Sequence, residues 1–284
     1  MADLWNTGWL TASEMFAPLR AAGANLPEIG WPDPSVLNAL AEARGRIVNA
    51  RGQQLRFVVQ KPVEQARKAE SFEAGFEARA YLKGEVQVRP LDWHDLFNAL
   101  VWMTFPTAKA VINARHHESM AAGEAGQRPA LRDALTLFDE EGVVVLSSDR
   151  ELLDLVRNFQ WKELFWIRRE EVRENMRFFL FGHALYQKAL KPFIGMTGKA
   201  ILLEASTEFL QRPLRSQVTD VDRQLALYLW DASRIGKGRD LAPLPVLGVP
   251  GWWKDNEAQA FYDNIGYFRP GRRPEPGQAA PSSM

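Results

Sequence analysis

The sequence predicts an α+β fold that is predominantly helical, with a small β-hairpin or sheet packed on a helical core. Apolar residues recur at helical spacing over much of the chain, whereas runs rich in β-branched and aromatic residues are short and few. The 284 residues are 46% hydrophobic and 25% charged, the proportions of an ordinary globular protein. This length fits one large domain or two small ones.

Residues 1–30 are predicted to form a Trp-rich arm interrupted by prolines. Trp5 and Trp9 are expected to dock on the core, as large aromatic side chains at a chain end usually do. A helix is expected from Pro34 to about Ala50, because Asp33 is a good N-cap and proline suits the first turn.

Two short strands are expected next, at Leu55–Gln60 and at Glu85–Arg89, on either side of a charged stretch. That stretch, from Pro62 to Lys83, is expected to be broadly helical.

The central block is predicted to begin with two consecutive helices. Asp92 caps the first, which runs to about Phe105, and Pro106 interrupts the chain before a second helix from Thr107 to Ala121. A loop is expected at Gly123–Pro129.

A β-hairpin is predicted after that loop. Two β-rich runs, Asp133–Asp139 and Val143–Ser148, flank the glycine-containing turn at Glu140–Gly142. In this interpretation Asp133 and Asp139 share one strand face.

The rest of the chain is predicted to be mostly helical. Ala200–Ala205 fits either a strand or the start of a helix. Helices are expected at residues 149–159, 161–168, 173–190 and 220–234. A single domain is predicted over residues 31–240, followed by a Pro/Gly-rich extension over residues 241–284 that ends, from Arg269, as a disordered tail.

Composition and charge exclude several classes of function. The 35 basic and 35 acidic residues balance, which argues against a nucleic-acid binder of the electrostatic type. The absence of cysteine excludes disulfides, thiolate metal sites and a cysteine nucleophile. We find no signal-peptide pattern and no apolar run of membrane-spanning length, so a cytoplasmic location without membrane contact is expected.

Polar residues on strongly apolar elements are the candidate functional residues, because buried polar groups need partners. The helix from Asp92 to Phe105 is apolar on almost every face, yet it contains His94, Asp95 and Asn98. The next helix contributes Lys109, Asn113 and one of the adjacent histidines His116 and His117, which cannot both face the same site.

His183 follows the apolar run 178–181 and the glycine Gly182, which weakens a helix unless another element packs closely against it. A close packing contact at Gly182 would bring His183 near another element.

Several of these segments resemble a bacterial family, the domain of unknown function 3025. The resemblance extends over roughly residues 30 to 240 and implies a single family domain in a bacterial protein, but it implies no reaction. The matching runs occur in order at Asp92–Trp102, Phe105–Lys109, Asn113–His116, Arg132–Glu140 and Phe181–Leu185.

A metal-dependent hydrolase is the leading enzymatic hypothesis. Histidine with carboxylate suits zinc, manganese or iron, and such an ion would make hydroxide from bound water near neutral pH. The candidate ligands are His94, His116, Asp133, Asp139 and His183. Asp95 either joins His94 in the chemistry or serves as a carboxylate near a helix N-terminus. The candidate residues for orienting substrate or stabilising charge are Asn98, Lys109, Asn113 and Arg132.

Two other hypotheses remain open at this stage. One is metal-free catalysis, with His94 or His183 as a general base and Lys109 or Arg132 stabilising negative charge. The other is a non-catalytic interaction or scaffold protein in which the same polar residues only hold the core together. The partner in either case is an unspecified small molecule or protein.

Overall fold

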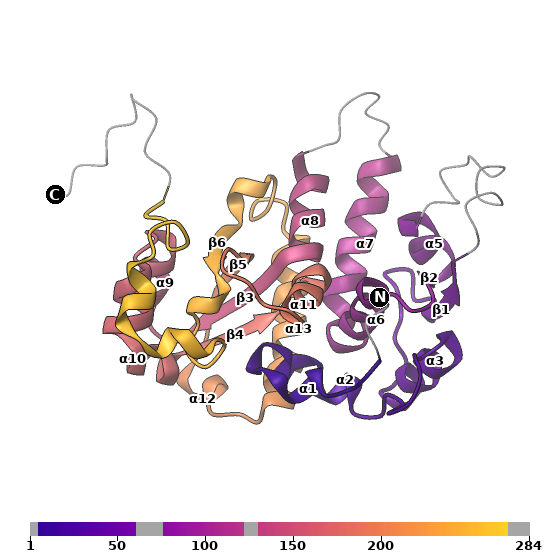
Figure 1. Ribbon diagram of the computed structural model, residues 1–284. Coiled ribbons are helices and arrows are strands. Elements are labelled where there is room, and N and C mark those ends of the chain that lie inside the picture. Colours follow the sequence, from indigo (N-terminus) through magenta and orange to yellow (C-terminus); the bar gives the residue numbers. More distant parts are fainter. Residues whose placement is uncertain (1–4, 61–75, 122–129, 272–284) are drawn as a thin grey trace.

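The computed structural model describes residues 5–60, 76–121 and 130–271 (Figure 1). Helices make up most of its regular structure and the strands form small sheets, so the predicted α+β, predominantly helical class is confirmed. In Figure 1 a sheet lies near the centre, with helices α6, α7 and α8 on its right and α9, α10 and the C-terminal segment on its left. No helix within these residues is long and apolar enough to cross a membrane.

The central sheet has four strands in the order β4-β3-β5-β6. Strand β3 runs antiparallel to β4 and parallel to β5, and β6 runs antiparallel to β5. All six residues of β3 are buried, as expected for a strand covered on both faces. The strands are β3 (Gly142–Ser147), β4 (Met176–Leu180), β5 (Thr197–Glu204) and β6 (Ala242–Pro245). The run at 200–205, for which the sequence left two interpretations, therefore belongs to a strand.

The two predicted N-terminal strands are confirmed as β1 (Arg56–Val59) and β2 (Glu85–Val88), which pair in parallel. Helix α5 (Phe76–Lys83) precedes β2, and the remainder of the predicted charged helical stretch, residues 62–75, lies outside the described residues.

Helix α3 (Pro34–Ala43) begins where the sequence predicts and ends earlier than predicted. The Asp33 side chain accepts hydrogen bonds from the backbone amides of Ser35 and Val36. Gly45 follows the helix with φ of 110°, a left-handed conformation that commonly ends a helix, so the chain does not continue as helix to residue 50.

The predicted pair of central helices is confirmed as α6 (Trp93–Thr104) and α7 (Pro106–Ala121). Asp92 caps α6 by accepting a hydrogen bond from the Asp95 amide. Helix α7 is capped from a distant element, because Asp222 accepts hydrogen bonds from the amides of Thr107 and Ala108. The loop predicted at 123–129 lies outside the described residues.

The predicted hairpin is wrong, because its first run is the helix α8 (Ala130–Glu141). Leu131, Ala134, Leu135 and Phe138 recur at helical spacing, and the last three are buried on one face. The alternation of Asp133, Leu135, Leu137 and Asp139 would suit a strand equally well. The segment is a helix because the helical arrangement buries the apolar face described above. The second run is the predicted strand, β3, which follows α8 directly.

The predicted long helix over 173–190 is also wrong. The chain forms α10 (Arg169–Asn175), then strand β4, then α11 (His183–Ala189). The β-prone segment Met176–Leu180 gains a full ladder with β3 in this arrangement. Arg177 donates hydrogen bonds to the carbonyls of Arg173 and Glu174 and so satisfies the end of α10.

Gly182 is required by a close backbone contact between the start of α11 and the end of α8. A Cβ at this position would overlap the Glu140 carbonyl oxygen and the amides of Glu141 and Gly142. This contact places His183, the first residue of α11, beside the last turn of α8.

The remaining elements surround the sheet. The helix expected at 220–234 is α13, which both starts and ends earlier than predicted. The segment 163–167 forms a π-helix. The other helices are α1 (Trp9–Ala12), α2 (Arg20–Gly23), α9 (Arg150–Arg157), α12 (Thr207–Leu210) and α13 (Leu214–Trp230), and short 3₁₀ turns occur at 14–19, 238–240, 246–248, 254–257 and 259–263. Of the C-terminal tail predicted from Arg269, residues 272–284 lie outside the described residues.

The N-terminal segment packs against the core, as expected from its aromatic residues. Phe16 is 1% exposed and its ring stacks on Phe97 of α6 and on Tyr186 of α11. Trp5 stacks on Trp93, with the two ring centres 5.5 Å apart. The two helices that carry His94 and His183 are therefore covered by this segment.

Candidate metal centre

Three helices bring His94, Glu140 and His183 together. His94 lies in the first turn of α6, Glu140 in the last turn of α8, and His183 at the start of α11. The Nε2 atoms of the two histidines are 3.0 Å apart. Glu140 lies 3.9 Å from His94 Nε2 through Oε1 and 3.7 Å from His183 Nε2 through Oε2. One ligand atom from each residue lies within 4.8 Å of the others.

The donor atoms of this cluster are of the kinds that bind divalent metals, and the spacing of its two nitrogens fits such an ion. Two ligands bonded to one ion at about 2.0–2.1 Å lie about 3.0–3.4 Å apart, which matches the two Nε2 atoms. Two histidines with one carboxylate form catalytic sites for zinc and for non-haem iron, because open positions remain for water and substrate. A shared proton between the two rings is the other arrangement that this geometry allows.

Asp139 lies behind His183 and holds Lys109. The Lys109 ammonium contacts both carboxylate oxygens of Asp139, at 2.5 and 2.8 Å, and the Asn98 Oδ1 atom at 2.9 Å. Asp139 Oδ2 lies 3.6 Å from the Nδ1 atom of His183. This distance is too long for a hydrogen bond, so Asp139 acts on the His183 ring through its negative charge.

The electrostatic environment keeps His183 neutral. Burial lowers the pKa of His183 to about 3, and the nearby Asp139 only partly offsets this. Burial raises the pKa of Glu140, and His94 opposes that shift. Burial also opposes ionisation of Asp139, but Lys109, together with His183 and His116, holds the pKa of Asp139 below its usual value. A neutral imidazole is the form of histidine that binds a metal.

The cluster lies on the wall of a pocket of about 320 Å³. This volume is sufficient for a small molecule. The described residues that line it are Gln60, Phe76, Glu77, Gln87, Arg89, His94, Asp95, Asn98, His116, Thr136, Asp139, Glu140 and His183.

Asp95 lines the pocket but is occupied by an ion pair. Both of its oxygens contact the Arg89 guanidinium at 2.8 Å, and one of them also accepts the Arg89 amide at 2.7 Å. These hydrogen bonds hold the pKa of Asp95 below its usual range although burial opposes them. The alternative in which Asp95 acts near a helix N-terminus fits this arrangement better than a role as a reactive group.

The structure separates the adjacent histidines. His116 is buried and lines the pocket, whereas the His117 ring stacks on Tyr81 with the ring centres 4.1 Å apart. Asp133 is exposed, and neither Asp133 nor Arg132 is among the described residues that line the pocket. The sequence predicts Asp133 at the site because a strand would align it with Asp139, and Arg132 as a group that orients substrate or stabilises charge; this pocket lining includes neither.

Asn113 reaches the pocket through Glu77, a residue that the sequence interpretation did not select. The Asn113 side-chain amide donates hydrogen bonds to the Glu77 carbonyl and to Glu77 Oε2, at 2.9 and 2.6 Å. Burial raises the pKa of Glu77, and the nearby charge of Asp139 raises it further.

Glu140 was missed as well, although a signal for it exists in the sequence. Thr136, Asp139 and Glu140 follow helical spacing, so they share one face of α8 once this segment is assigned as a helix. No comparable periodic signal marks Glu77, because it belongs to a separate element, α5.

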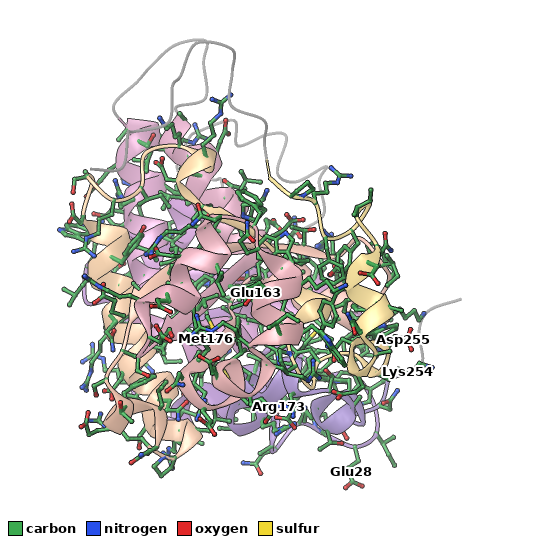
Figure 2. All side chains as sticks on the ribbon, turned by 90° about the vertical axis from the view of Figure 1, so that its left-hand side faces the viewer. Glu28, Glu163, Arg173, Met176, Lys254 and Asp255 are labelled. Atoms are coloured by element: carbon green, nitrogen blue, oxygen red, sulfur yellow. The ribbon has the colours of Figure 1, made fainter. Side chains whose placement is uncertain are left out.

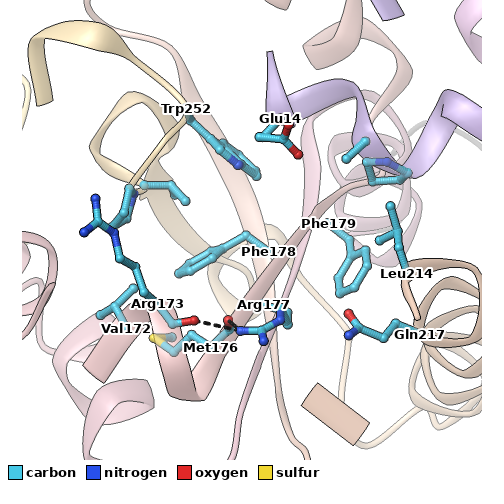
Figure 3. A pocket seen from close by; sticks show the side chains of 14 residues that line it. Glu14, Val172, Arg173, Met176, Arg177, Phe178, Phe179, Leu214, Gln217 and Trp252 are labelled. Carbon is cyan, nitrogen blue, oxygen red and sulfur yellow. Dashed lines mark hydrogen bonds between the residues drawn. The ribbon is translucent and has the colours of Figure 1, made fainter. Parts of the chain in front are cut away.

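A larger hollow of about 430 Å³ lies on another face of the molecule (Figure 3). Figure 2 turns this face, with Arg173 and Met176 of the α10–β4 region, towards the viewer. Its polar groups are engaged in structural contacts: Arg177 binds backbone carbonyls, and Gln217 donates to the carbonyls of Leu210 and Arg212. In contrast to this hollow, the pocket at His94 is lined by titratable groups that converge on one cluster.

The fold and the pocket define a mixed α+β protein with a His–His–Glu cluster at the meeting point of three helices. The model of the family "Protein of unknown function (DUF3025)" matches residues 55–272, and the chain belongs to this family. The resemblance noted in the sequence motifs is thereby confirmed. No curated protein and no solved structure matches the chain significantly.

Proposed function

We propose that this protein is a metal-dependent hydrolase in which His94, His183 and Glu140 bind one divalent cation. The observation that carries the proposal is the convergence of two imidazole nitrogens and one carboxylate from three separate helices. Three protein ligands leave further coordination positions open, as in catalytic sites rather than in closed structural ones.

Burial and the supporting residues favour a site of this kind. His183 is 5% exposed, and a neutral buried imidazole whose Nε2 points at another histidine needs either a proton or a cation between the rings. Asp139, which contacts the Lys109 ammonium, lies 3.6 Å from His183 Nδ1 and acts on this ring through its charge.

The bound ion would supply hydroxide near neutral pH by lowering the pKa of a coordinated water. This chain's own residues would hold and orient the substrate. The Asn98 oxygen accepts from Lys109, so its amide nitrogen is the end that can donate to a substrate oxygen in the pocket.

Hydrolysis assays on metal-free and reloaded protein test the proposal. The protein is stripped with a chelator, reloaded with Zn²⁺, Mn²⁺ or Fe²⁺, and assayed on amides, esters and phosphoesters. We expect hydrolysis that depends on the reloaded metal and is lost in Glu140→Gln. His117→Ala is the matched control, because that ring lies against Tyr81 and not in the pocket.

Folded protein that hydrolyses none of these substrates in any metal form would contradict the proposal. Such a result would favour the alternative of an interaction protein whose polar residues are structural.

A further inference from the structure

The pocket wall includes a carboxyl group that the metal cluster does not use. Glu77 lines the same pocket as His94, Glu140 and His183 but is not part of the group whose ligand atoms lie within 4.8 Å of one another. Because Glu77 and the cluster line one pocket of about 320 Å³, a small substrate in that pocket could contact both.

Two cations next to this pocket, Arg89 and Lys109, already contact carboxylates. Arg89 contacts both oxygens of Asp95 and also lies 3.2 Å from Asp92. Lys109 contacts both oxygens of Asp139. An anionic substrate such as a phosphate or a carboxylate would have to compete with these carboxylates for either cation.

Glu77, in contrast, makes no direct ion pair with another described residue. Lys109 and Arg132 act on it only through longer-range charge interactions, and the hydrogen bond to its carboxylate comes from a neutral amide. Asn113, which donates this bond, is 2% exposed, and its Oδ1 atom is a buried acceptor without a hydrogen-bond donor among the described residues. Glu77 lines the pocket and accepts from Asn113 through Oε2, which leaves its Oε1 atom for an N–H donor of a ligand.

We propose that Glu77, held in place by Asn113, forms a recognition subsite for a protonated nitrogen, so that the pocket takes small molecules carrying an ammonium or guanidinium group. The inference rests on the proposed function in one respect, namely that the reacting bond of such a molecule would lie at the His94–His183–Glu140 cluster.

The charge balance of the pocket supports this choice. The two ion pairs cancel, which leaves Glu77 and Glu140 as the remaining described carboxyl groups of the wall. A metal ion would neutralise Glu140, and a ligand cation would neutralise Glu77. Burial disfavours the ionised form of Glu77, as its raised pKa indicates, and a cationic ligand offsets that cost.

Binding of simple probes to the metal-loaded protein tests the subsite. The cationic probes are methylguanidine and n-butylamine, and the anionic probes are acetate and inorganic phosphate, each titrated by calorimetry. We expect both cations to bind wild type, and to bind Glu77→Gln at least about tenfold more weakly. Glu118→Gln, which removes an exposed carboxylate from α7, is the matched control and should bind the cations as wild type does.

Metal stoichiometry and thermal unfolding, measured on the same samples, separate this inference from the proposed function. Glu77→Gln should keep its metal and its unfolding midpoint. Glu77-dependent binding of cations to a protein that takes up no metal would support the subsite and contradict the hydrolase. Equal cation affinity in wild type and Glu77→Gln, or binding of the anions alone, would overturn the subsite whatever the metal content.

Discussion

Lys109 is the residue on which the polar interior around α6, α7 and α8 depends. Its ammonium is nearly buried, contacts Asp139 and Asn98, and lies over the Trp102 ring at 5.4 Å. In Lys109→Met the Asp139 carboxylate would stay buried without its cation. We expect the free energy of unfolding in urea to fall by about 3–5 kcal/mol. The double variant Lys109→Met/Asp139→Leu should be more stable than the single one, and a single variant as stable as wild type would contradict this account.

Asp222 gives a stability contribution that depends on pH. Its pKa is raised by burial, although two amides of α7 donate to it. The folded protein therefore keeps this proton at pH values where the unfolded chain, with a pKa near 3.8, has lost it. The stabilisation of the folded state by this difference in pKa is complete below pH 3.8, and it is lost as the pH rises through the raised pKa of Asp222.

Asp222→Asn has no such titration, so its unfolding midpoint should approach that of wild type as the pH increases from about 4 to 7. Thermal melts of both proteins at several pH values measure this difference. A gap that widens with pH would show that the sign is wrong.

At the scale of elements, the contact between the end of α8 and the start of α11 positions the site. Gly182→Ala would force the backbones of these two helices apart, because the added Cβ overlaps backbone atoms of Glu140 and Gly142. We expect a loss of about 1–3 kcal/mol in unfolding free energy, measured by urea denaturation, together with weaker metal binding.

Gly236→Ala is the control for this substitution, since a Cβ there meets only an ordinary contact at 3.8 Å from the Asp240 side chain. Metal affinity unchanged in Gly182→Ala would mean that the helix contact does not set the distance between His183 and Glu140.

The elements that could be predicted from sequence are those with local signals. Asp33 and Asp92 mark their helices by N-capping, and β1, β2 and β3 stand out as β-prone runs. The first run of the hairpin and strand β4 could not be assigned in this way. Their local pattern fits two structures, and the choice depends on burial against distant elements.

The candidate site was predictable to a similar extent. The sequence selected His94, Asn98, Lys109, Asp139 and His183 as polar residues on apolar elements, and the structure brings these together. Glu140 was not selected because the segment that forms α8 was predicted as a strand. The same wrong prediction led to the selection of Asp133. Glu77 depends on how α5 packs on α7, which no local pattern reveals.

At the scale of the whole molecule, the N-terminal segment is part of the core that supports the site. Phe16 packs between α6 and α11, the helices of His94 and His183. Phe16→Ala should cost about 3–5 kcal/mol in unfolding free energy. Ile29→Ala, at a side chain 93% exposed in the same segment, should change stability by less than about 0.5 kcal/mol. Chemical denaturation of both variants checks this, and a mild effect at Phe16 would mean that the segment is peripheral.

The metal content of the protein tests the central claim most directly. Plasma mass spectrometry on wild type, His94→Ala, His183→Ala, Glu140→Gln and the control His117→Ala gives the number of ions per chain. We predict about one divalent ion in wild type and in His117→Ala and none in the other three variants, with all five proteins folded. Folded wild type without metal after incubation with Zn²⁺, Mn²⁺ or Fe²⁺, or variants of the cluster that keep their ion, would contradict the account.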